Sequence, residues 1–384
     1  MASLTNFNKL SEMLQTFITE EEVENLCKKW GYRDTARKFS TRDLVRFFVI
    51  SSAKDWKSFR DAETKMPQEE SLPSVDHSTL AKKAQNVPYQ ILQELFSRLV
   101  NRLGRGVRRA LFKPYKLFAI DSTTITFQHP DMSWAGYTRT RYAIRLHTKF
   151  DVEEGQPTQV IPTTGRHHDV MMAPKLYEDT EPLSIITADR GYARTRDFED
   201  LQENNQFFVI RVASSFSLSG EREHSVPLNE EGNVKEDLTA FIGKGTRKTK
   251  VRFRLVTFTD NEGNKIRVAS NLMMMSPEDI AYIYKLRWQI ELFFRWVKGN
   301  LDLSNLFGNS PNSVYSQVYG TLISYLLLRW IYNETKEEWA TLHSFTFIEF
   351  TRRYVAYTLP VEVRCAVKSL FERRGSLCQS LGKI

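Results

Sequence analysis

Two apolar segments that each carry an aspartate place the strongest limit on the fold of this chain. The segment "LSIITADRGY" (183–192) is largely apolar up to Asp189, which is the pattern of a strand buried on both faces. The segment "KLFAIDSTTITF" (116–127) is apolar and β-branched, with Asp121 in its middle. Such strands occur in sheets with helices on both sides, so the sequence predicts an α/β core. Aspartate is depleted in strands and costly to bury unpaired, so both acids need an explanation.

Residues 1–115 are predicted to form an all-helical domain. Thr19 and Glu22 have the spacing of a capping box, and Asp76 is placed to cap a helix that ends before Pro88. Two helices around this turn are compatible with a helix-turn-helix, although short helical pairs are common. Residues 1–116 hold 21 Lys and Arg against 14 Asp and Glu, whereas the other 268 residues hold 33 against 32. The basic surplus fits a DNA-binding domain and equally fits solvated helix faces.

The remainder is expected to hold an α/β domain, over residues 116–335, and a C-terminal helical segment, over 336–384. Three consecutive strands followed by alternating helices and strands predict a mixed sheet across 116–212. Turn signals such as "NEEGN" and "DNEGNK" then separate short strands, which predicts a β-rich insertion at about 213–276. A length of 384 residues exceeds what one core usually supports, in agreement with several domains.

The segment "YKLRWQIELFFRWVK" (284–298) is predicted to be helical, with an unusual set of polar residues. At about 100° per residue, Tyr284, Arg287, Glu291 and Lys298 fall within an arc of about 60°. Apolar residues fill the neighbouring arc, so the polar residues form a stripe along the edge of a buried face. Arg287 and Glu291 also form the i, i+4 pair that is common on helix surfaces, so an amphipathic helix with chance ion pairs is the plain alternative.

Asp121, Asp189 and Glu291 together predict a site for divalent metal. A single aspartate at a strand end is more often a turn residue, but three carboxylates on a sheet and its helix form a cage of hard oxygen ligands. Such a cage suits Mg²⁺ or Mn²⁺, and two ions can support phosphodiester cleavage. The neighbouring Tyr, Arg and Lys side chains are suited to hold phosphate oxygens.

The sequence resembles the DDE transposases of bacterial insertion sequences, in the branch called the insertion-sequence-four family. The signature of that branch is Tyr, two residues, Arg, three residues, Glu, six residues, Lys, and Tyr284, Arg287, Glu291 and Lys298 match every gap. The contexts "AIDSTT" at Asp121 and "ADRGY" at Asp189 are also similar to the family. The resemblance covers roughly residues 116–335.

The resemblance implies a ribonuclease-H-like core and an enzyme that cleaves DNA at transposon ends and joins the freed strand to target DNA. Asp121, Asp189 and Glu291 would hold two Mg²⁺ ions, for which Mn²⁺ substitutes. Tyr284, Arg287 and Lys298 would grip the backbone of the transposon end. The partners implied are double-stranded DNA, as terminal inverted repeats and as target, and a second copy of the chain in a homodimer. The helical N-terminal domain is similar in placement to the family's DNA-binding region.

One departure concerns the β-rich insertion. Relatives that cut through a DNA hairpin are thought to brace a flipped base with a tryptophan there, and residues 213–276 contain no Trp. Stacking of a base on a phenylalanine is the alternative, although each is better explained as a core or strand residue. The candidates are Phe216, Phe241, Phe253 and Phe258 in the insertion, with Trp134 and Trp288 outside it.

Two further motifs contain residue types that can bind metal or phosphate. "GRHHD" (165–169) contains adjacent histidines that point apart and rarely chelate together, which favours a structural or phosphate-contact role; the alternative is that His168 or Asp169 borders the site. "GKGTRKTK" (243–250) lacks the spacing of a phosphate-binding P-loop, so phosphate contact and simple solvation remain equal alternatives.

The sequence also bears on location and on competing functions. No apolar run reaches the length of about 18 residues expected of a membrane span, the N-terminus does not resemble a signal peptide, and three scattered cysteines suit a reducing compartment. We therefore expect a cytoplasmic bacterial protein that associates with the nucleoid. The competing functions are a catalytically inactive, transposase-derived DNA-binding protein and a related metal-dependent DNA nuclease.

Overall fold

The computed structural model describes residues 10–69, 71–103, 114–127, 130–138, 141–178, 180, 183–224, 233–260, 262–300 and 306–381. By its internal contacts the chain divides into two compact units. Unit 1 contains Met1–Val107, Thr126–Tyr142 and Arg295–Ile384, and unit 2 contains Arg108–Ile125 and Ala143–Phe294. Each unit is thus assembled from segments that are distant in sequence, and the domain boundaries expected at 115/116 and 335/336 stay predictions.

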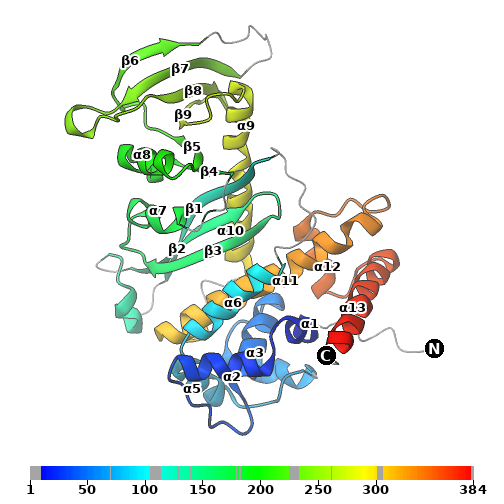
Figure 1. Cartoon of the computed structure of the whole chain (residues 1–384). Coiled ribbons are helices and arrows are strands. Elements are labelled where there is room, and N and C mark those ends of the chain that lie inside the picture. The colour runs from blue at the N-terminus through cyan, green and yellow to red at the C-terminus, as the bar shows by residue number, and fades with distance from the viewer. Residues whose placement is uncertain are drawn as a thin grey trace. The chain divides into compact units, whose positions relative to one another are not determined.

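Unit 2 is built around a nine-stranded mixed sheet (Figure 1). Its strands are β1 (Lys116–Phe127), β2 (Tyr142–Asp151), β3 (Gln156–Thr164), β4 (Ser184–Ala188), β5 (Phe207–Arg211), β6 (Leu218–Glu223), β7 (Val234–Ile242), β8 (Phe253–Thr259) and β9 (Lys265–Ser270). Their order is β3-β2-β1-β4-β5-β9-β8-β7-β6. Strands β1, β4 and β5 run parallel, whereas β2 with β3 and the series from β5 through β9 to β6 pair antiparallel.

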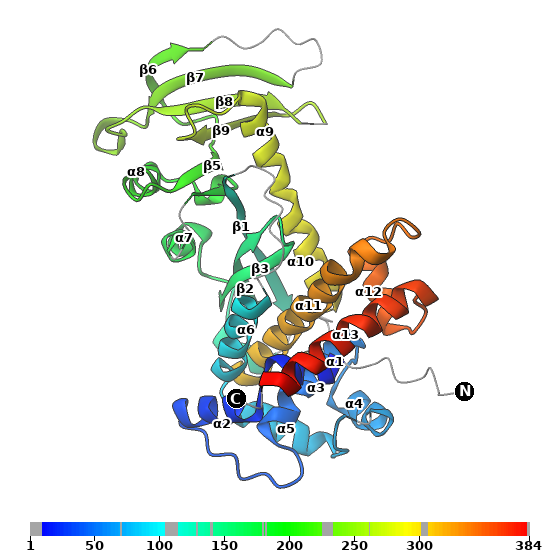
Figure 2. The ribbon, with the colours of Figure 1, turned by 45° about the vertical axis from the view of Figure 1, so that its right-hand side comes forward.

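Helices cover both faces of the parallel strands, as the apolar character of β4 predicts. Helices α7 (Asp169–Tyr177) and α8 (Thr195–Glu203) pack on one face, in a core that includes Ile120, Phe198 and Phe208. Helix α9 (Pro277–Leu286) contacts β4, β5, β7, β8 and β9, and Figure 2 shows it on the opposite side of the sheet from α7 and α8. Because successive residues of a strand point to opposite faces, the side chains of Ile120 and Asp121 lie on opposite faces of the sheet.

The β-rich insertion continues the core sheet. Strand β9 returns beside β5, with Val209 opposite Ser270 and Arg211 opposite Val268. The expected α/β class, with its ribonuclease-H-like mixed sheet, β-rich insertion and helical N-terminal region, is therefore confirmed, and the insertion adds four strands to the same sheet.

A buried ion pair joins two strands of this insertion. The guanidinium of Arg254 on β8 donates from Nε to Oδ1 of Asp237 at 2.9 Å and from Nη2 to Oδ2 at 2.7 Å. Its Nη1 donates to the carbonyl oxygens of Leu272, Met273 and Met275. Arg254 and Asp237 are 6% and 4% exposed, so this pair is removed from water and fully hydrogen-bonded.

Unit 1 is helical. Its helices are α1 (Leu10–Phe17), α2 (Glu20–Lys29), α3 (Thr41–Ala53), α4 (Phe59–Lys65), α5 (His77–Asn86), α6 (Gln90–Leu103), α11 (Pro311–Trp339), α12 (Phe347–Val355) and α13 (Val361–Leu381). The C-terminal part of α10 (Trp288–Asn300) also belongs to this unit. Helix α11 packs against α3, α5, α6 and α13 and is buried along most of its length. Among the described residues, no helix has both the length and the apolar character that crossing a membrane requires.

Close packing between α3 and α11 depends on a glycine. A Cβ atom built on Gly320 would lie 2.4 Å from Cβ of Phe48, so only a residue without a side chain fits there. Beside this contact, Oγ of Ser52 donates to Oγ1 of Thr321 at 2.9 Å. The expected capping box of Thr19 with Glu22 and the cap by Asp76 are both confirmed in this unit.

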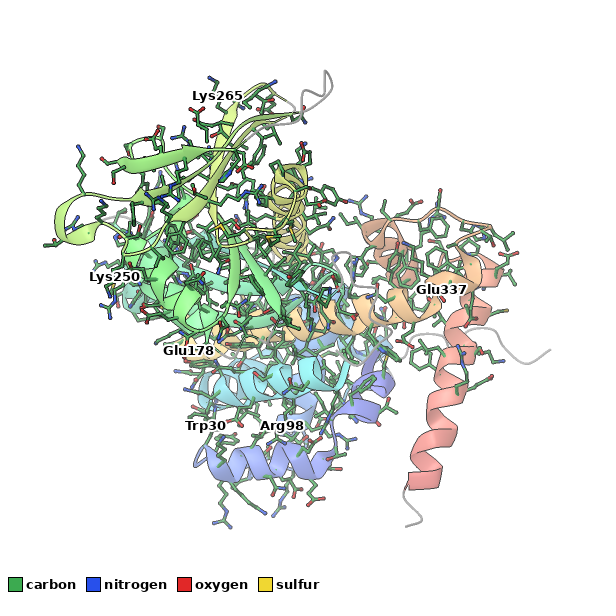
Figure 3. The ribbon with its side chains drawn as sticks, turned by 45° about the horizontal axis from the view of Figure 1, so that its top comes forward. Trp30, Arg98, Glu178, Lys250, Lys265 and Glu337 are labelled. Atoms are coloured by element: carbon green, nitrogen blue, oxygen red, sulfur yellow. The ribbon has the colours of Figure 1, made fainter. Side chains whose placement is uncertain are left out.

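The helices around the turn before Pro88 are confirmed as α5 and α6, but several of their basic side chains are engaged within the unit. Arg98 and Arg102 of α6 pair with Glu22 of α2, and hydrogen bonding to Arg102 lowers the pKa of Glu22 to about 2. Lys83 of α5 is buried against Asp34. Figure 3 labels Arg98 on α6. With α2 and α11 both packed on α6, these contacts do not support α6 as a recognition helix.

Candidate active site

A row of charged residues crosses three parallel strands at the face covered by α9. Ile120 pairs with Ala188, and Ala188 pairs with Ile210. The next residue on each strand is Asp121, Asp189 or Arg211, and neighbouring strands lie about 4.8 Å apart. The row is closed at one end by an ion pair of 3.6 Å between Nη1 of Arg211 and Oδ1 of Asp189.

Helices α9 and α10 bring three polar residues to this row. The hydroxyl of Tyr284 donates to Oδ1 of Asp189 at 3.2 Å. Arg287 donates from Nη1 to Oδ2 of Asp121 at 2.9 Å and from Nη2 to Oε1 of Glu291 at 2.7 Å. The guanidinium of Arg287 therefore bridges a strand carboxylate and a helix carboxylate.

The single helix expected from the sequence is divided at Arg287. The backbone N–H of Arg287 donates to the carbonyl of Tyr284 at 3.2 Å, and that of Ile290 donates to the carbonyl of Arg287 at 3.1 Å. These bonds span three residues, where an α-helix spans four, so the turn is tightened at this point. The division separates α9 from α10 and leaves Arg287 and Glu291 close enough to pair.

Burial and charge set the protonation of the site. Burial raises the pKa of Asp121 to about 6, and the neighbouring carboxylates of Asp189 and Glu291 raise it further, whereas Arg287 opposes the shift. Burial by itself lowers the pKa of Arg287, but Tyr284, Asp121 and Glu291 outweigh burial and raise it, so the guanidinium stays charged. Burial also raises the pKa of Tyr284, so its hydroxyl stays protonated and acts as a donor.

The structure brings five of the six predicted site residues into contact. Asp121, Arg287 and Glu291 form one bonded group and Tyr284 and Asp189 another, and the guanidinium carbon of Arg287 lies 5.5 Å from the ring centroid of Tyr284. Lys298 is exposed on α10, seven residues after Glu291, which corresponds to about 10 Å along a helix. The catalytic, metal-binding and DNA-binding roles of all six stay predictions.

The donor set suits a hard divalent cation, but the present arrangement is held by Arg287. Carboxylate oxygens are the ligands that Mg²⁺ and Mn²⁺ prefer. Within the ranges that the structure describes, no three His, Cys, Asp or Glu side chains are grouped closely enough to hold a metal ion. Arg287 accounts for this spacing, because its two terminal nitrogens occupy Asp121 and Glu291. Its Nε is buried and has no partner among the described residues. Asp121 and Glu291 share this arginine and Asp189 lies on the strand beside Asp121, so the three acids fit a site in which a stronger cation replaces the guanidinium.

Sequence reasoning missed Arg211 and Ser122. Arg211 directly follows the apolar segment "FFVI", and a cation after a buried strand is a usable signal, but only the register of β4 and β5 places it beside Asp189. Ser122 follows Asp121, and its hydroxyl donates to Oδ1 of Asp169 at 2.5 Å. That contact joins residues 47 positions apart and has no signature in the sequence.

The other aromatic and basic candidates have local structural roles. Trp134 donates its indole N–H to the carbonyl of Asn309 at 2.8 Å and packs edge-on against Tyr315. Phe253 and Phe258 are buried strand residues, and Phe216 packs against the core. The ring of Phe241 lies beneath Lys248 and Arg252, at 4.6 and 4.5 Å from its centroid. Trp288 is half exposed at the first position of α10.

The histidines of "GRHHD" do not form a pair. His168 is the residue before α7 and its side chain makes no capping bond, whereas Nδ1 of His167 lies 3.1 Å from the hydroxyl of Thr164. In "GKGTRKTK", the backbone N–H of Lys250 donates to Glu199 while its side chain is exposed, and Figure 3 labels Lys250 and Lys265 on the β-rich part of unit 2.

Comparison with known proteins gives a consistent family. Residues 112–327 match the model of the transposase DDE domain. A protein named as a transposase for insertion sequence element IS5377, from Geobacillus stearothermophilus, is 36% identical over 365 residues, which cover 94% of this chain and 95% of the relative. A protein named as a transposase for insertion sequence element IS4SA, from Synechocystis sp., is 26% identical over 265 residues, covering 67% of this chain and 72% of the relative.

Among solved structures, the chain has a distant likeness to the piggyBac transposase synaptic complex with hairpin DNA. The likeness has a TM-score of 0.48 at 12% sequence identity, and covers 92% of this chain and 80% of that one. The family match over more than half of the chain, together with the similarity to the IS5377 protein along nearly its full length, is decisive. The chain belongs to the DDE transposases of bacterial insertion sequences, in the insertion-sequence-four branch.

Proposed function

We propose that Asp121, Asp189 and Glu291 are the catalytic carboxylates of this DNA transposase and hold its metal ions. Membership of the family makes the protein a DNA-cleaving, strand-transferring enzyme that depends on divalent metal. The single observation that carries the assignment is the convergence of the two strand aspartates and the helix glutamate around Arg287.

The metal is proposed to be Mg²⁺, with Mn²⁺ as a substitute and two ions at each site. Divalent ions between such carboxylates activate an attacking oxygen and neutralise a leaving oxygen in phosphodiester chemistry. Ionised Asp121, Asp189 and Glu291 supply oxygen ligands of the preferred type. The raised pKa of Asp121, about 6, leaves this group mostly ionised near neutral pH and therefore able to act as a ligand.

Arg287 is proposed to change partners when DNA binds. In the present arrangement its two terminal nitrogens neutralise Asp121 and Glu291. A DNA phosphate offers the same bidentate acceptor geometry as a carboxylate. Transfer of the guanidinium to a phosphate would release both carboxylates for the metal, so that DNA binding and metal binding support each other. Tyr284 would keep Asp189 in place through its hydroxyl bond.

The DNA substrates proposed are the terminal inverted repeats of the element and a target duplex. Tyr284, Arg287 and Lys298 are proposed to contact the backbone of the transposon end, and residues 1–115 to contribute to DNA binding. The active assembly is proposed to be a homodimer that holds two ends, at work in the bacterial cytoplasm on the nucleoid. A duplex carrying the short inverted repeats that bracket the gene is the natural probe.

The experiment is Glu291→Gln, which keeps the size of the side chain and removes its charge. We expect cleavage of an end duplex in Mg²⁺ to fall at least about a thousandfold, equivalent to about 4 kcal/mol of activation free energy, with end binding within about twofold of wild type. Glu278→Gln, in the first turn of α9, is the matched control and should cleave normally. Unchanged cleavage by Glu291→Gln would refute the assignment. Loss of cleavage in every variant, and in wild type with Mn²⁺, would identify an inactive DNA-binding relative.

A further inference from the structure

Asp169, the first residue of α7, contacts the site from the far side of the sheet. Asp121 points to the face covered by α9, so the next residue, Ser122, points to the face covered by α7. There the hydroxyl of Ser122 donates to Oδ1 of Asp169 at 2.5 Å. The backbone N–H of Ser122 in turn donates to Oδ1 of Asp121 at 2.8 Å. Asp169 is therefore two hydrogen bonds away from the carboxylate of Asp121.

The same carboxylate borders the segment that follows Asp189. A Cβ atom built on Gly191 would lie 3.6 Å from Oδ2 and 3.9 Å from Cβ of Asp169, so the side chain of Asp169 lies beside Gly191 and leaves room there for little more than a methyl group. Gly191 belongs to the short helix η3 (Arg190–Tyr192) that starts directly after Asp189. The side chain of Asp169 thus hydrogen-bonds to the residue after Asp121 and lies beside the second residue after Asp189.

Basic residues of β2 fix the orientation and charge of Asp169. Nη1 of Arg145 donates to its Oδ1 at 3.4 Å, and Nδ1 of the fully buried His147 lies 3.4 Å from the same oxygen. Nε2 of His147 lies 3.0 Å from the hydroxyl of Thr163 on β3. Two basic neighbours disfavour a divalent cation at Asp169, so the contacts fit an anchor better than a metal ligand.

We propose that Asp169 is a positioning residue for DNA cleavage, which holds Asp121 through Ser122 and packs beside the turn after Asp189 at Gly191, and thereby fixes the position of Asp121 relative to Asp189. This inference rests on the proposed role of Asp121 and Asp189 as metal ligands. Metal ligands depend on outer hydrogen bonds for their orientation, and loss of such a partner typically costs ten- to a hundredfold in metal affinity or activity.

The test compares Asp169→Ala and Ser122→Ala with wild type. Three quantities are measured: the affinity for Mn²⁺ without DNA, by electron paramagnetic resonance of the free ion; the cleavage rate at saturating end duplex; and the dissociation constant of that duplex. We expect Mn²⁺ affinity to fall about tenfold and cleavage ten- to a hundredfold, with duplex binding within about twofold of wild type. Asp197→Ala is the matched control, because Asp197 is an ion-paired aspartate on α8 of the same unit, bound to Arg194. It should leave all three quantities near wild type.

Two further variants separate positioning from general stability. Ser122→Thr retains a hydroxyl and should restore most of the Mn²⁺ affinity lost in Ser122→Ala. The double variant Asp169→Ala/Ser122→Ala should have a Mn²⁺ affinity and a cleavage rate no lower than those of the more impaired single variant, because both changes remove the same hydrogen bond. If Asp169→Ala does not fold, the two Ser122 variants decide the question alone.

Wild-type Mn²⁺ affinity and cleavage in both Asp169→Ala and Ser122→Ala would overturn the proposal, and so would full additivity of the two changes. Glu291→Gln in the same assays keeps the outcomes apart. An inactive Glu291→Gln beside a normal Asp169→Ala refutes only the positioning role, whereas a normally active Glu291→Gln refutes the assignment of the site itself.

Discussion

Two arginines of unit 2 are held by carboxylates, and they differ in how completely their donors are used. Arg254 donates hydrogen bonds from two nitrogens to one carboxylate, that of Asp237, and from the third nitrogen to backbone carbonyls. Arg287 divides its terminal nitrogens between two carboxylates, Asp121 and Glu291, and its Nε has no partner among the described residues. The first is a closed structural pair, whereas the second leaves excess negative charge nearby. The difference indicates which arginine can exchange its partner without unfolding the sheet.

The largest effect is expected at the closed pair. Arg254→Met leaves the carboxylate of Asp237 buried without a counter-ion, which typically costs about 3–5 kcal/mol. Urea unfolding should report this loss of stability, while the cleavage rate per folded molecule stays near wild type. Arg254→Met/Asp237→Leu serves as the control and should recover part of the stability, because an apolar pair replaces the ions while the backbone carbonyls that Arg254 bound stay without this donor. A loss below about 1 kcal/mol in the single variant would contradict the closed-pair description.

Burial of Asp121, which Arg287 offsets only in part, predicts a stability that depends on pH. The pKa of Asp121 is about 6 in the folded protein against 3.8 for an unperturbed aspartate, so the folded state binds more protons between these values. Without metal, the free energy of unfolding should therefore fall as pH rises from about 4 to about 6, by about 2–3 kcal/mol from this group. Asp121→Asn removes the titrating group and should flatten that part of the curve. An identical slope in Asp121→Asn would show that other groups cause it.

The exchangeable arginine also predicts an effect on metal binding. Arg287→Met removes the cation that competes for Asp121 and Glu291, so Mn²⁺ should bind about tenfold more tightly in the absence of DNA, equivalent to about 1.4 kcal/mol. Isothermal titration calorimetry measures this change. Arg211→Met is the matched control, since Arg211 is ion-paired with Asp189, at 3.6 Å, and should have a smaller effect. Weaker Mn²⁺ binding in Arg287→Met would mean that the arginine assembles the metal site.

The smallest effect is expected at Lys298, which is exposed and contributes to neither arginine pair. If it contacts one backbone phosphate, Lys298→Ala should weaken binding of the end duplex modestly. It should also reduce the slope of log affinity against log salt by about one. Fluorescence anisotropy at several salt concentrations gives both values. Lys285→Ala, an exposed lysine on α9, is the control, and an equal change in both variants would point to general charge.

The sequence predicted the elements that carry the acids because their signals are local. Continuous apolar segments identified β1 and β4, and helical spacing identified the stripe from Tyr284 to Glu291. The tightened turn at Arg287 was missed because the periodicity of its side chains hardly changes when one turn narrows. The family resemblance supplied the assignment of roles, which spacing by itself left open.

Contacts that depend on strand register lay beyond the sequence. Asp121 and Asp189 are neighbours because Ile120 pairs with Ala188, and Arg211 joins them because Ala188 pairs with Ile210. Asp169 meets Ser122 only because α7 covers the opposite face. These relations are set by how strands and helices assemble, and no short-range pattern encodes them.

The return of β9 to the side of β5 also has a practical meaning. The chain forms β6, β7 and β8 after β5 and then returns as β9, directly beside β5. The turns that connect these outer strands are therefore free to change length without shifting β1 or β4. The turn closed by the bond from the N–H of Asp260 to the carbonyl of Asn264 is exposed, and its Gly263 adopts φ +83°. A fluorescent label or small tag grafted at this turn would leave β1 and β4 in place, which makes the turn a convenient handle for following the protein on DNA.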